Sequence, residues 1–297
     1  ARAERERADI QQVVDKQHGD FSVQAWDWNY YAGEVRREKY ALNENDIKPY
    51  FELDSVLTRG VFYAANRLFG IRMVERFDIP RYHEDVRTWE IFDKDGRGMA
   101  LFYGDFFARE SKSGGAWMGN FIEQSTLAAT APVIYNVCNY QKPAAGKPAL
   151  ISWDDVITLF HEFGHTLHGL FANTRYASLS GTNTPRDFVE FPSQINEHWA
   201  SHPEVFTHYA RHYQTDAPMP DALREKLFQS ARFNKGYDMT ELLSAALLDL
   251  NWHSIGAGQK IKDVTWFETA SLARENLLLE AVPPRYRSSY FAHIFGG

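Results

Sequence analysis

The sequence predicts a mainly α-helical protein with one small β-sheet, an α+β fold. Apolar residues recur at helical spacing through most of residues 1–70 and again through most of the chain after residue 153. Between about residues 86 and 140 the pattern changes to short segments rich in aromatic and β-branched residues, which is typical of strands. We therefore expect a helical segment at 1–70 and a second region at 71–297 that contains the sheet, further helices and the functional residues.

The first segment is expected to form helices separated by glycines. Gly19 and Gly70 interrupt the helical pattern, and the stretch before Gly70 is strongly apolar. The expected helices cover residues 1–17, 27–41 and 47–69.

The sheet is expected to be small and to precede the longest run of helices. Its predicted strands cover residues 86–92, 100–107 and 132–140, and Asp95-Gly96 predicts a hairpin turn between the first two. An exposed edge at Val133–Asn139 could hold a peptide through main-chain hydrogen bonds. A core strand without ligand contact is an equally good interpretation of that segment. Gly114-Gly115 could allow a substrate close to the backbone, although a plain loop is the commoner meaning of this pair.

Helical periodicity returns after the sheet and continues nearly to the end of the chain. Prolines at positions 203, 218, 220, 283 and 284 interrupt it. The expected helices cover residues 153–171, 188–200, 197–213, 221–233, 239–252 and 266–279.

The composition of the chain limits the kinds of molecule that it could bind. With 297 residues, 44% of them hydrophobic, the chain can bury a sizeable core. The net charge of −7 argues against nucleic acid as a partner, and no stretch reaches the roughly 20 apolar residues of a membrane span, so no membrane partner is expected. Cys138 is the only cysteine, which excludes an internal disulfide, and we expect it to pack as a small hydrophobic residue.

Residues 161–165 read His-Glu-Phe-Gly-His and predict a zinc site. On a helix, His161 and His165 lie one turn apart on the same face, where both imidazoles can reach a single ion. The flanking residues are apolar, and a metal ion is the simplest partner that offsets the cost of burying these polar side chains. Glu162 stands where it can take a proton from zinc-activated water and pass it to a leaving amine, which is the chemistry of peptide-bond hydrolysis.

The third ligand is expected to be Glu190, which follows His161 by 29 positions in the run Asp-Phe-Val-Glu-Phe-Pro-Ser-Gln. A catalytic zinc ion takes three protein ligands and leaves one position for water. His168 also lies on the helical face of the first two histidines. However, it is seven residues from His161, a rise of about 10 Å, whereas ligands lie about 2 Å from zinc.

Glu197 shares a helical face with Glu190 and is the candidate for a carboxylate that supports a ligand histidine without binding the metal itself. It could accept the free ring N–H of a ligand histidine, as such carboxylates commonly do. A surface glutamate is an equally good interpretation.

The motifs resemble the thimet-oligopeptidase-like zinc metallopeptidase family (M3), and within it the bacterial enzymes that release dipeptides. The resemblance rests on the segments Ala131–Tyr140, Phe160–His168, Asp187–Glu197 and Ser288–Gly297, and it extends along essentially the whole chain. It implies the catalytic region of a zincin-type helical peptidase. It also implies one zinc ion bound by His161, His165 and Glu190, with Glu162 as general base and acid, in agreement with the assignment from the residues themselves.

The resemblance implies the hydrolysis of short peptides, with release of C-terminal dipeptides, by a cytoplasmic enzyme for which we favour a monomer. An endo-acting oligopeptidase of the same family is the closest alternative. A zinc- or peptide-binding fragment without turnover is the alternative from a different class.

Two further residues are candidates for contacts with the substrate. By its place in the family motif, His293 could donate a hydrogen bond to the substrate carbonyl or to the oxyanion. Arg186, four residues before Glu190, could pair with the C-terminal carboxylate of a substrate, as release of a C-terminal dipeptide requires a cation. A salt bridge of Arg186 with Asp187, or with neighbours of Glu190, is the slightly favoured alternative.

The resemblance further implies that the sequence is an internal fragment of a longer enzyme. Residues 1–70 would belong to a larger helical scaffold. The chain would end at Gly297, inside a glycine-rich loop whose tyrosines, in the family, contact the substrate and the oxyanion. On this reading the metal centre is present, whereas one wall of the substrate cleft is not.

Overall fold

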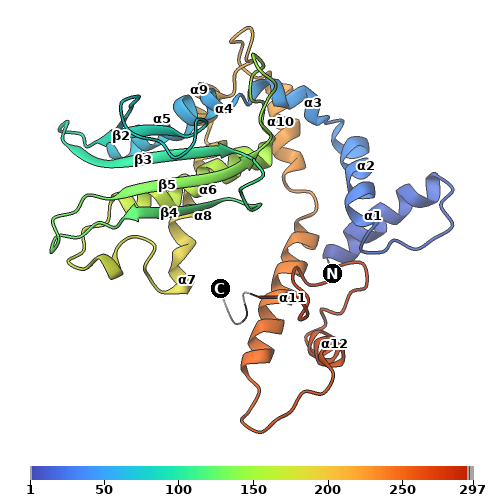
Figure 1. Cartoon of the computed structure of the whole chain (residues 1–297). Coiled ribbons are helices and arrows are strands. Elements are labelled where there is room, and N and C mark those ends of the chain that lie inside the picture. Colours follow the sequence, from blue (N-terminus) through green and yellow to red (C-terminus); the bar gives the residue numbers. More distant parts are fainter. Residues whose placement is uncertain (1, 293, 295–297) are drawn as a thin grey trace. The chain divides into compact units, whose positions relative to one another are not determined.

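The computed structural model describes residues 2–292 and residue 294, and it confirms the α+β prediction (Figure 1). The chain divides into two compact units, one formed by residues 1–43 with 221–297 and the other by residues 44–220. The helical segment predicted at 1–70 is therefore shared between the units. Within the described part of the chain, no helix combines the length and apolar character that crossing a bilayer requires.

The first unit is a group of helices around a small apolar core that includes Ile10, Val14 and Trp28. Buried polar contacts join its distant segments. The indole Nε1 of Trp28 donates to Asn234 at 2.8 Å, and Glu6 accepts hydrogen bonds from the amides of Gly236 and Tyr237 at the start of a long helix. The helices are α1 (Arg2–Lys16), α2 (Trp28–Tyr40), α10 (Asp221–Ser230), α11 (Lys235–His253) and α12 (Val264–Arg274).

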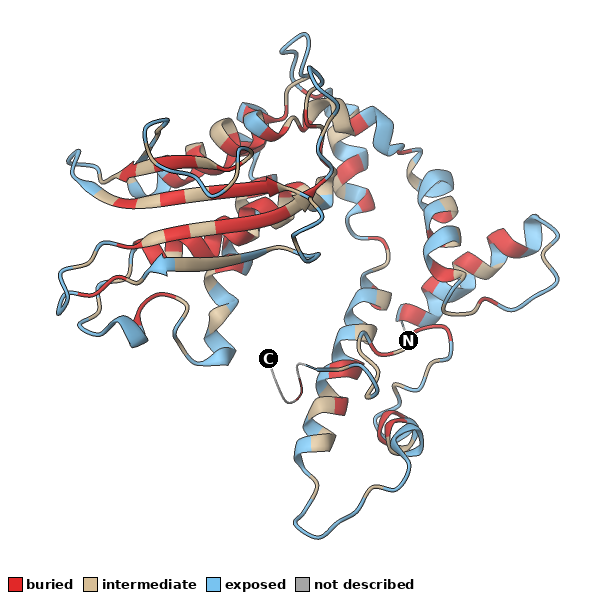
Figure 2. Cartoon of the chain, in the orientation of Figure 1, coloured by how far each residue is buried: buried red, intermediate tan, exposed pale blue. Residues whose placement is uncertain are grey.

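The second unit packs its helices against a sheet and contains the three predicted metal ligands and Glu162. Buried and partly exposed positions alternate along the first part of each central strand, and three consecutive residues are buried further along (Figure 2). Its helices are α3 (Glu44–Ile47), the 3₁₀ turn η1 (Lys48–Tyr50), α4 (Leu53–Ser55), the π-helical segment η2 (Val56–Val61), α5 (Phe62–Phe69), α6 (Trp153–Leu170), the 3₁₀ turn η3 (Ala177–Leu179), α7 (Arg186–Val189), α8 (Phe191–Ser201) and α9 (Pro203–Tyr209).

Two helices predicted as continuous are interrupted. The segment predicted at 47–69 breaks at Phe51 and Glu52, between η1 and α4, where the backbone is not helical. It also takes π-helical geometry at η2, where Gly60 lies against the buried ring of Tyr209 and an added Cβ would come within 3.0 Å of that ring. The segment predicted at 197–213 breaks at His202, whose extended backbone precedes Pro203, the first residue of α9. The helix then ends at Tyr209 rather than Tyr213.

The sheet has five strands in the order β1-β2-β3-β5-β4, of which the sequence predicted three. Strands β3 and β5 are parallel, and the other neighbours are antiparallel. The expectation of an exposed edge at Val133–Asn139 is wrong, because β5 lies between β3 and β4. The edge next to it is β4, which the sequence did not predict. The strands are β1 (Arg72–Glu75), β2 (Arg87–Phe92), β3 (Gly98–Phe107), β4 (Trp117–Ile122) and β5 (Val133–Tyr140).

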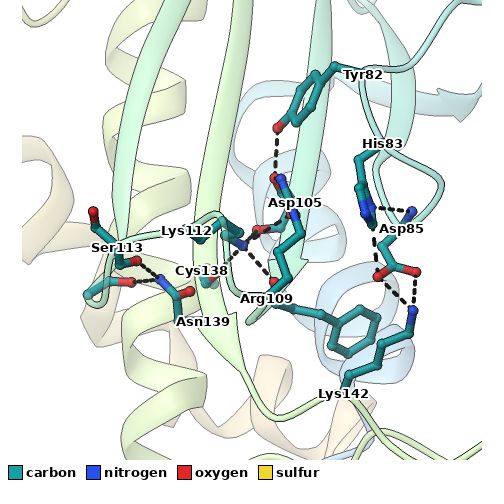
Figure 3. Close-up of polar contacts among 12 residues, drawn as sticks. Tyr82, His83, Asp85, Asp105, Arg109, Lys112, Ser113, Cys138, Asn139 and Lys142 are labelled. Carbon is teal, nitrogen blue, oxygen red and sulfur yellow. Dashed lines mark hydrogen bonds and ion pairs between the residues drawn. The ribbon is translucent and has the colours of Figure 1, made fainter.

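A buried ionic network fixes the loop that leads into β4 (Figure 3). The Asp105 carboxylate accepts hydrogen bonds from Arg109, Lys112 and Tyr82, at 2.7–3.1 Å. Burial raises the pKa of Asp105, but these donors outweigh that effect and hold it below its usual value. Lys112 also donates to the carbonyl oxygens of Phe107 and Cys138. Further along the loop, the Asn139 amide donates to the carbonyl oxygens of Ser113 and Gly115, each at 2.7 Å. The loop is thereby tied to strands β3 and β5.

Lys112→Met should destabilise the second unit by about 3 kcal/mol, because it breaks a buried ion pair and leaves carbonyl oxygens without their donor. Lys142→Met provides a matched control. It removes a lysine from the ion pair with Asp85, in which the Lys142 side chain is 50% exposed compared with 5% for Lys112. That surface change should cost less than about 1 kcal/mol. Urea unfolding followed by tryptophan fluorescence measures the loss of stability in each variant. Equal losses in Lys112→Met and Lys142→Met would contradict a structural role for the Asp105 network.

Candidate metal centre

Helix α6 is held rigidly on the sheet, and its sequence explains why. Ser152 and Asp155 form a capping box at its start, in which each side chain bonds the backbone amide of the other residue. Phe163 on its buried face contacts the rings of Phe62 and Phe102 at centroid distances of 5.5 and 5.4 Å. Residues His161 to His165 are therefore presented on a helix whose start and inner face are both fixed.

The three residues predicted as ligands lie together. His161 Nε2 and His165 Nε2 are 3.1 and 3.2 Å from the same oxygen of Glu190, Oε2. One ligand atom from each of the three residues lies within 4.8 Å of the others, which is close enough to hold one metal ion. Two ligands bound about 2.0–2.1 Å from a tetrahedral ion lie about 3.3 Å apart, so these nitrogen–oxygen distances suit such an ion.

Glu190 projects from the junction of two helices. Helix α7 ends at Val189, and α8 begins at Phe191 with Pro192 in its first turn. The Ser193 hydroxyl lies within hydrogen-bond distance of two Glu190 acceptors, the backbone carbonyl oxygen at 2.9 Å and the carboxylate Oε2 at 3.0 Å, and the second contact helps to orient the carboxylate. Sequence reasoning missed Ser193. Its position three residues after the predicted ligand, on the first turn of a helix, is the signal that could have identified it.

Glu162 lies beside the histidines with its side chain buried. Its Oε2 atom has no hydrogen-bond partner among the described residues, and neither has His165 Nδ1. Burial raises the pKa of Glu162 to about 7, with a lowering contribution from His161 and a raising one from Glu190. A buried carboxylate without a partner is costly for folding alone. This arrangement is typical of a group that acts on a ligand.

Glu197 contacts His161 from the side away from Glu190. Its Oε1 atom is 2.7 Å from His161 Nδ1, so the two ring nitrogens of His161 face two different glutamates. Burial lowers the pKa of His161, but the bond with Glu197 and the nearby carboxylates outweigh it and leave the pKa above its usual value. With the carboxylate at Nδ1, the Nε2 atom is left to face Glu190.

The remaining candidates are His168, Arg186 and His293. His168 is on the same helix but packs its ring against Phe188, at a centroid distance of 6.0 Å, and it is not one of the three grouped residues. Arg186 is exposed, and in residues 2–292 and 294 no ion pair joins it to Asp187. His293 lies outside the described residues.

A cleft of about 420 Å³ opens onto the cluster. One wall comes from the start of the edge strand β4, and another from the loop and helix that precede Glu190. The floor is α6. The lining residues are Ala116, Trp117, Met118, His161, Glu162, His165, Thr182, Val189 and Glu190.

Comparison with known proteins shows the family of the chain. The model of peptidase family M3 matches residues 1–297. Dipeptidyl carboxypeptidase of Escherichia coli is 71% identical over 296 residues, and that of Salmonella typhimurium is 70% identical over 292 residues. Oligopeptidase A of Escherichia coli is 34% identical over 304 residues. These matches cover 98–100% of this chain but only 43–44% of each relative, so the chain spans less than half the length of these proteins. The resemblance seen in the motifs is confirmed, and the chain belongs to peptidase family M3.

Proposed function

We propose that this chain binds one zinc ion through His161, His165 and Glu190, and that it hydrolyses short peptides by releasing dipeptides from their C-termini. One observation carries the proposal: both histidine Nε2 atoms converge on Glu190 Oε2, at 3.1 and 3.2 Å, beside Glu162, whose Oε2 atom has no hydrogen-bond partner among the described residues. Two imidazoles and one carboxylate are a donor set typical of catalytic zinc.

Each residue of the cluster has a distinct task in this proposal. A bound zinc ion would polarise the scissile carbonyl and lower the pKa of a water molecule. Glu162 takes the proton of the attacking water and returns it to the leaving amine, a transfer for which a pKa near neutrality is well suited. His161 and His165 offer their Nε2 atoms as donors to the metal, and the Ser193 hydroxyl contacts the Glu190 carboxylate that faces them.

The substrate backbone would lie along β4. This strand is at the end of the sheet order, so one side of its main chain has no neighbouring strand among residues 2–292 and 294. Its first residues, Trp117 and Met118, line the cleft. An extended peptide can add to such an edge through main-chain hydrogen bonds that do not depend on its side chains. That arrangement suits an enzyme that accepts short peptides of varied sequence.

Glu197→Ala should lower the zinc affinity by about 10–100-fold, because carboxylates behind a ligand histidine orient its ring and strengthen its donation. A surface glutamate would have no such effect. Competition with a chelator measures the affinity. Glu204, which is exposed and pairs with Tyr63 and Arg67 away from the cluster, provides the control, and Glu204→Ala should bind zinc as the unchanged protein does.

Dipeptide release is favoured over internal cleavage by the names of the relatives. The proteins that are 70–71% identical are dipeptidyl carboxypeptidases, whereas the oligopeptidase A sequence is 34% identical. A zinc- or peptide-binding role without turnover is the third candidate, because the chain covers only 44% of the first relative. The cytoplasmic location and the monomeric state stay predictions, as do the roles of Arg186 and His293.

The deciding experiment uses peptides with a blocked N-terminus and either a free or an amidated C-terminus. Mass spectrometry of the products should show successive dipeptides from the free form and slow or no cleavage of the amidated form. Internal cleavage of both forms would contradict dipeptide release in favour of an endopeptidase. Zinc binding without cleavage of either form would support the binding role.

A further inference from the structure

The packing of α8 on α6 decides whether Glu190, which directly precedes α8, and Glu197, which lies within it, reach the histidines of α6. We propose that Asn196 is a positioning residue, which fixes the axial register of these two helices and thereby the geometry of the metal centre. The inference rests on the zinc site of the proposed function, and it adds a residue that touches neither the metal nor the substrate.

Three contacts define how the helices pass one another. The Asn196 side chain donates from Nδ2 to the carbonyl oxygen of Phe160 at 2.6 Å, in a buried position. Further along α6, Gly164 faces Ser193, and an added Cβ would lie 2.6 Å from the Ser193 Cα. Further still, the Glu190 carboxylate reaches the second histidine of the motif. Residue numbers rise along α6 as they fall along α8, so the two helices are antiparallel.

The metal centre is sensitive to sliding of one helix along the other. A shift by one residue moves a helix about 1.5 Å along its axis, whereas ligand distances in metal sites are held to within about 0.2 Å. Gly164 allows the helices to approach closely, but a flat glycine surface does not select one axial position. The bond from Asn196 does, because it joins one directional donor to one carbonyl oxygen.

This bond lies directly next to the contacts that it would control. Asn196 precedes Glu197 in α8, and Phe160 precedes His161 in α6. The Asn196–Phe160 bond and the Glu197–His161 contact therefore have the same separation of 36 residues along the chain. A carbonyl inside an α-helix already accepts the amide four residues further on, so Phe160 does not need the second donor for its own satisfaction. The extra hydrogen bond therefore serves to fix the axial position of α8 relative to α6.

Asn136 provides a matched control. Its side chain is fully buried in β5 and donates to the carbonyl oxygen of Glu162 at 3.1 Å. The bond is of the same kind and reaches the same helix, but it comes from the sheet, which contributes none of the three grouped residues. Loss of this bond should weaken the packing of α6 on the sheet without changing the register of α6 against α8.

The experiment compares Asn196→Leu, Asn136→Leu and the unchanged chain. Zinc affinity is measured by chelator competition, coordination by the absorption spectrum of the Co²⁺-loaded protein, and folding by urea unfolding of the metal-free protein. Asn196→Leu should weaken zinc binding by about 10–100-fold, the range found for groups that orient ligands, and should change the Co²⁺ spectrum. Asn136→Leu should lower the unfolding midpoint, while zinc affinity and the spectrum stay as in the unchanged chain.

The inference would be overturned if Asn196→Leu kept the zinc affinity and the Co²⁺ spectrum of the unchanged chain. A lower unfolding midpoint would not rescue it, because a residue that only supports packing would lower the midpoint without changing the metal site. If the leucine variant does not fold, Asn196→Ala, which adds no bulk, decides by the same comparison. If all three proteins bind zinc equally well, the proposed role of Asn196 is refuted, but the proposed zinc site is not. Absence of zinc binding in the unchanged chain refutes the proposed function as well.

Discussion

Glu162→Gln should abolish peptide hydrolysis and leave zinc binding intact. Glutamine keeps the size of the side chain but cannot take a proton from water, and removal of a general base costs about 10²–10⁴-fold in rate. Glu162 is not one of the three residues that converge as candidate ligands, so the metal content should not change. Hydrolysis of a blocked peptide with a free C-terminus, together with metal analysis of the same sample, measures both properties.

The zinc content of the Glu162→Gln variant is the internal control of that experiment. A variant with normal zinc content and no turnover assigns Glu162 to the proton transfer. A variant that hydrolyses peptides at the normal rate would refute this assignment. A variant that loses its zinc would show that the Glu162 carboxylate supports the metal centre itself.

His165→Ala should remove stoichiometric zinc binding. His165 is buried, and its Nε2 atom faces Glu190 Oε2, so alanine removes one of the three converging donors and leaves no side-chain donor in its place. The loss of affinity should exceed the roughly 100-fold effect that is typical of residues behind the ligands. Atomic emission of the dialysed protein gives the zinc content, and chelator competition gives the affinity.

His168→Ala is the control for this substitution, because His168 lies on the same helix, one turn further on, and contacts Phe188 instead of the cluster. It should bind zinc as the unchanged protein does. If His165→Ala and His168→Ala lost the same amount of zinc, the loss would reflect damage to the helix and would not identify His165 as a ligand.

The grouping of His161, His165 and Glu190 could be predicted from the sequence because the spacing of the two histidines is local. Histidines four residues apart on one helix must share a face, and the sequence between Ser152 and Leu170 leaves no doubt about the helix. Glu190 could be predicted as the third member because an acidic residue in a suitable run follows at a plausible distance. The contact of Glu197 with His161 was only one of two equal interpretations, since it depends on how α8 packs against α6.

Features set by distant parts of the chain could not be predicted in this way. The edge strand β4 has glycine and asparagine among its residues, and its place outside β5 depends on the loop that Lys112 and Asn139 hold. The π-helical segment η2 arises where Gly60 meets Tyr209, a residue far away in sequence. In both cases tertiary packing overrides the local pattern.

The zinc content of the purified, unmodified chain tests the central claim most directly. After extensive dialysis against metal-free buffer, atomic emission spectrometry should find about one zinc ion per chain, as expected for three converging ligands. The same measurement on His161→Ala should find almost none. An unmodified chain that is folded by circular dichroism and holds no zinc, even after exposure to a small excess of Zn²⁺, would contradict the account.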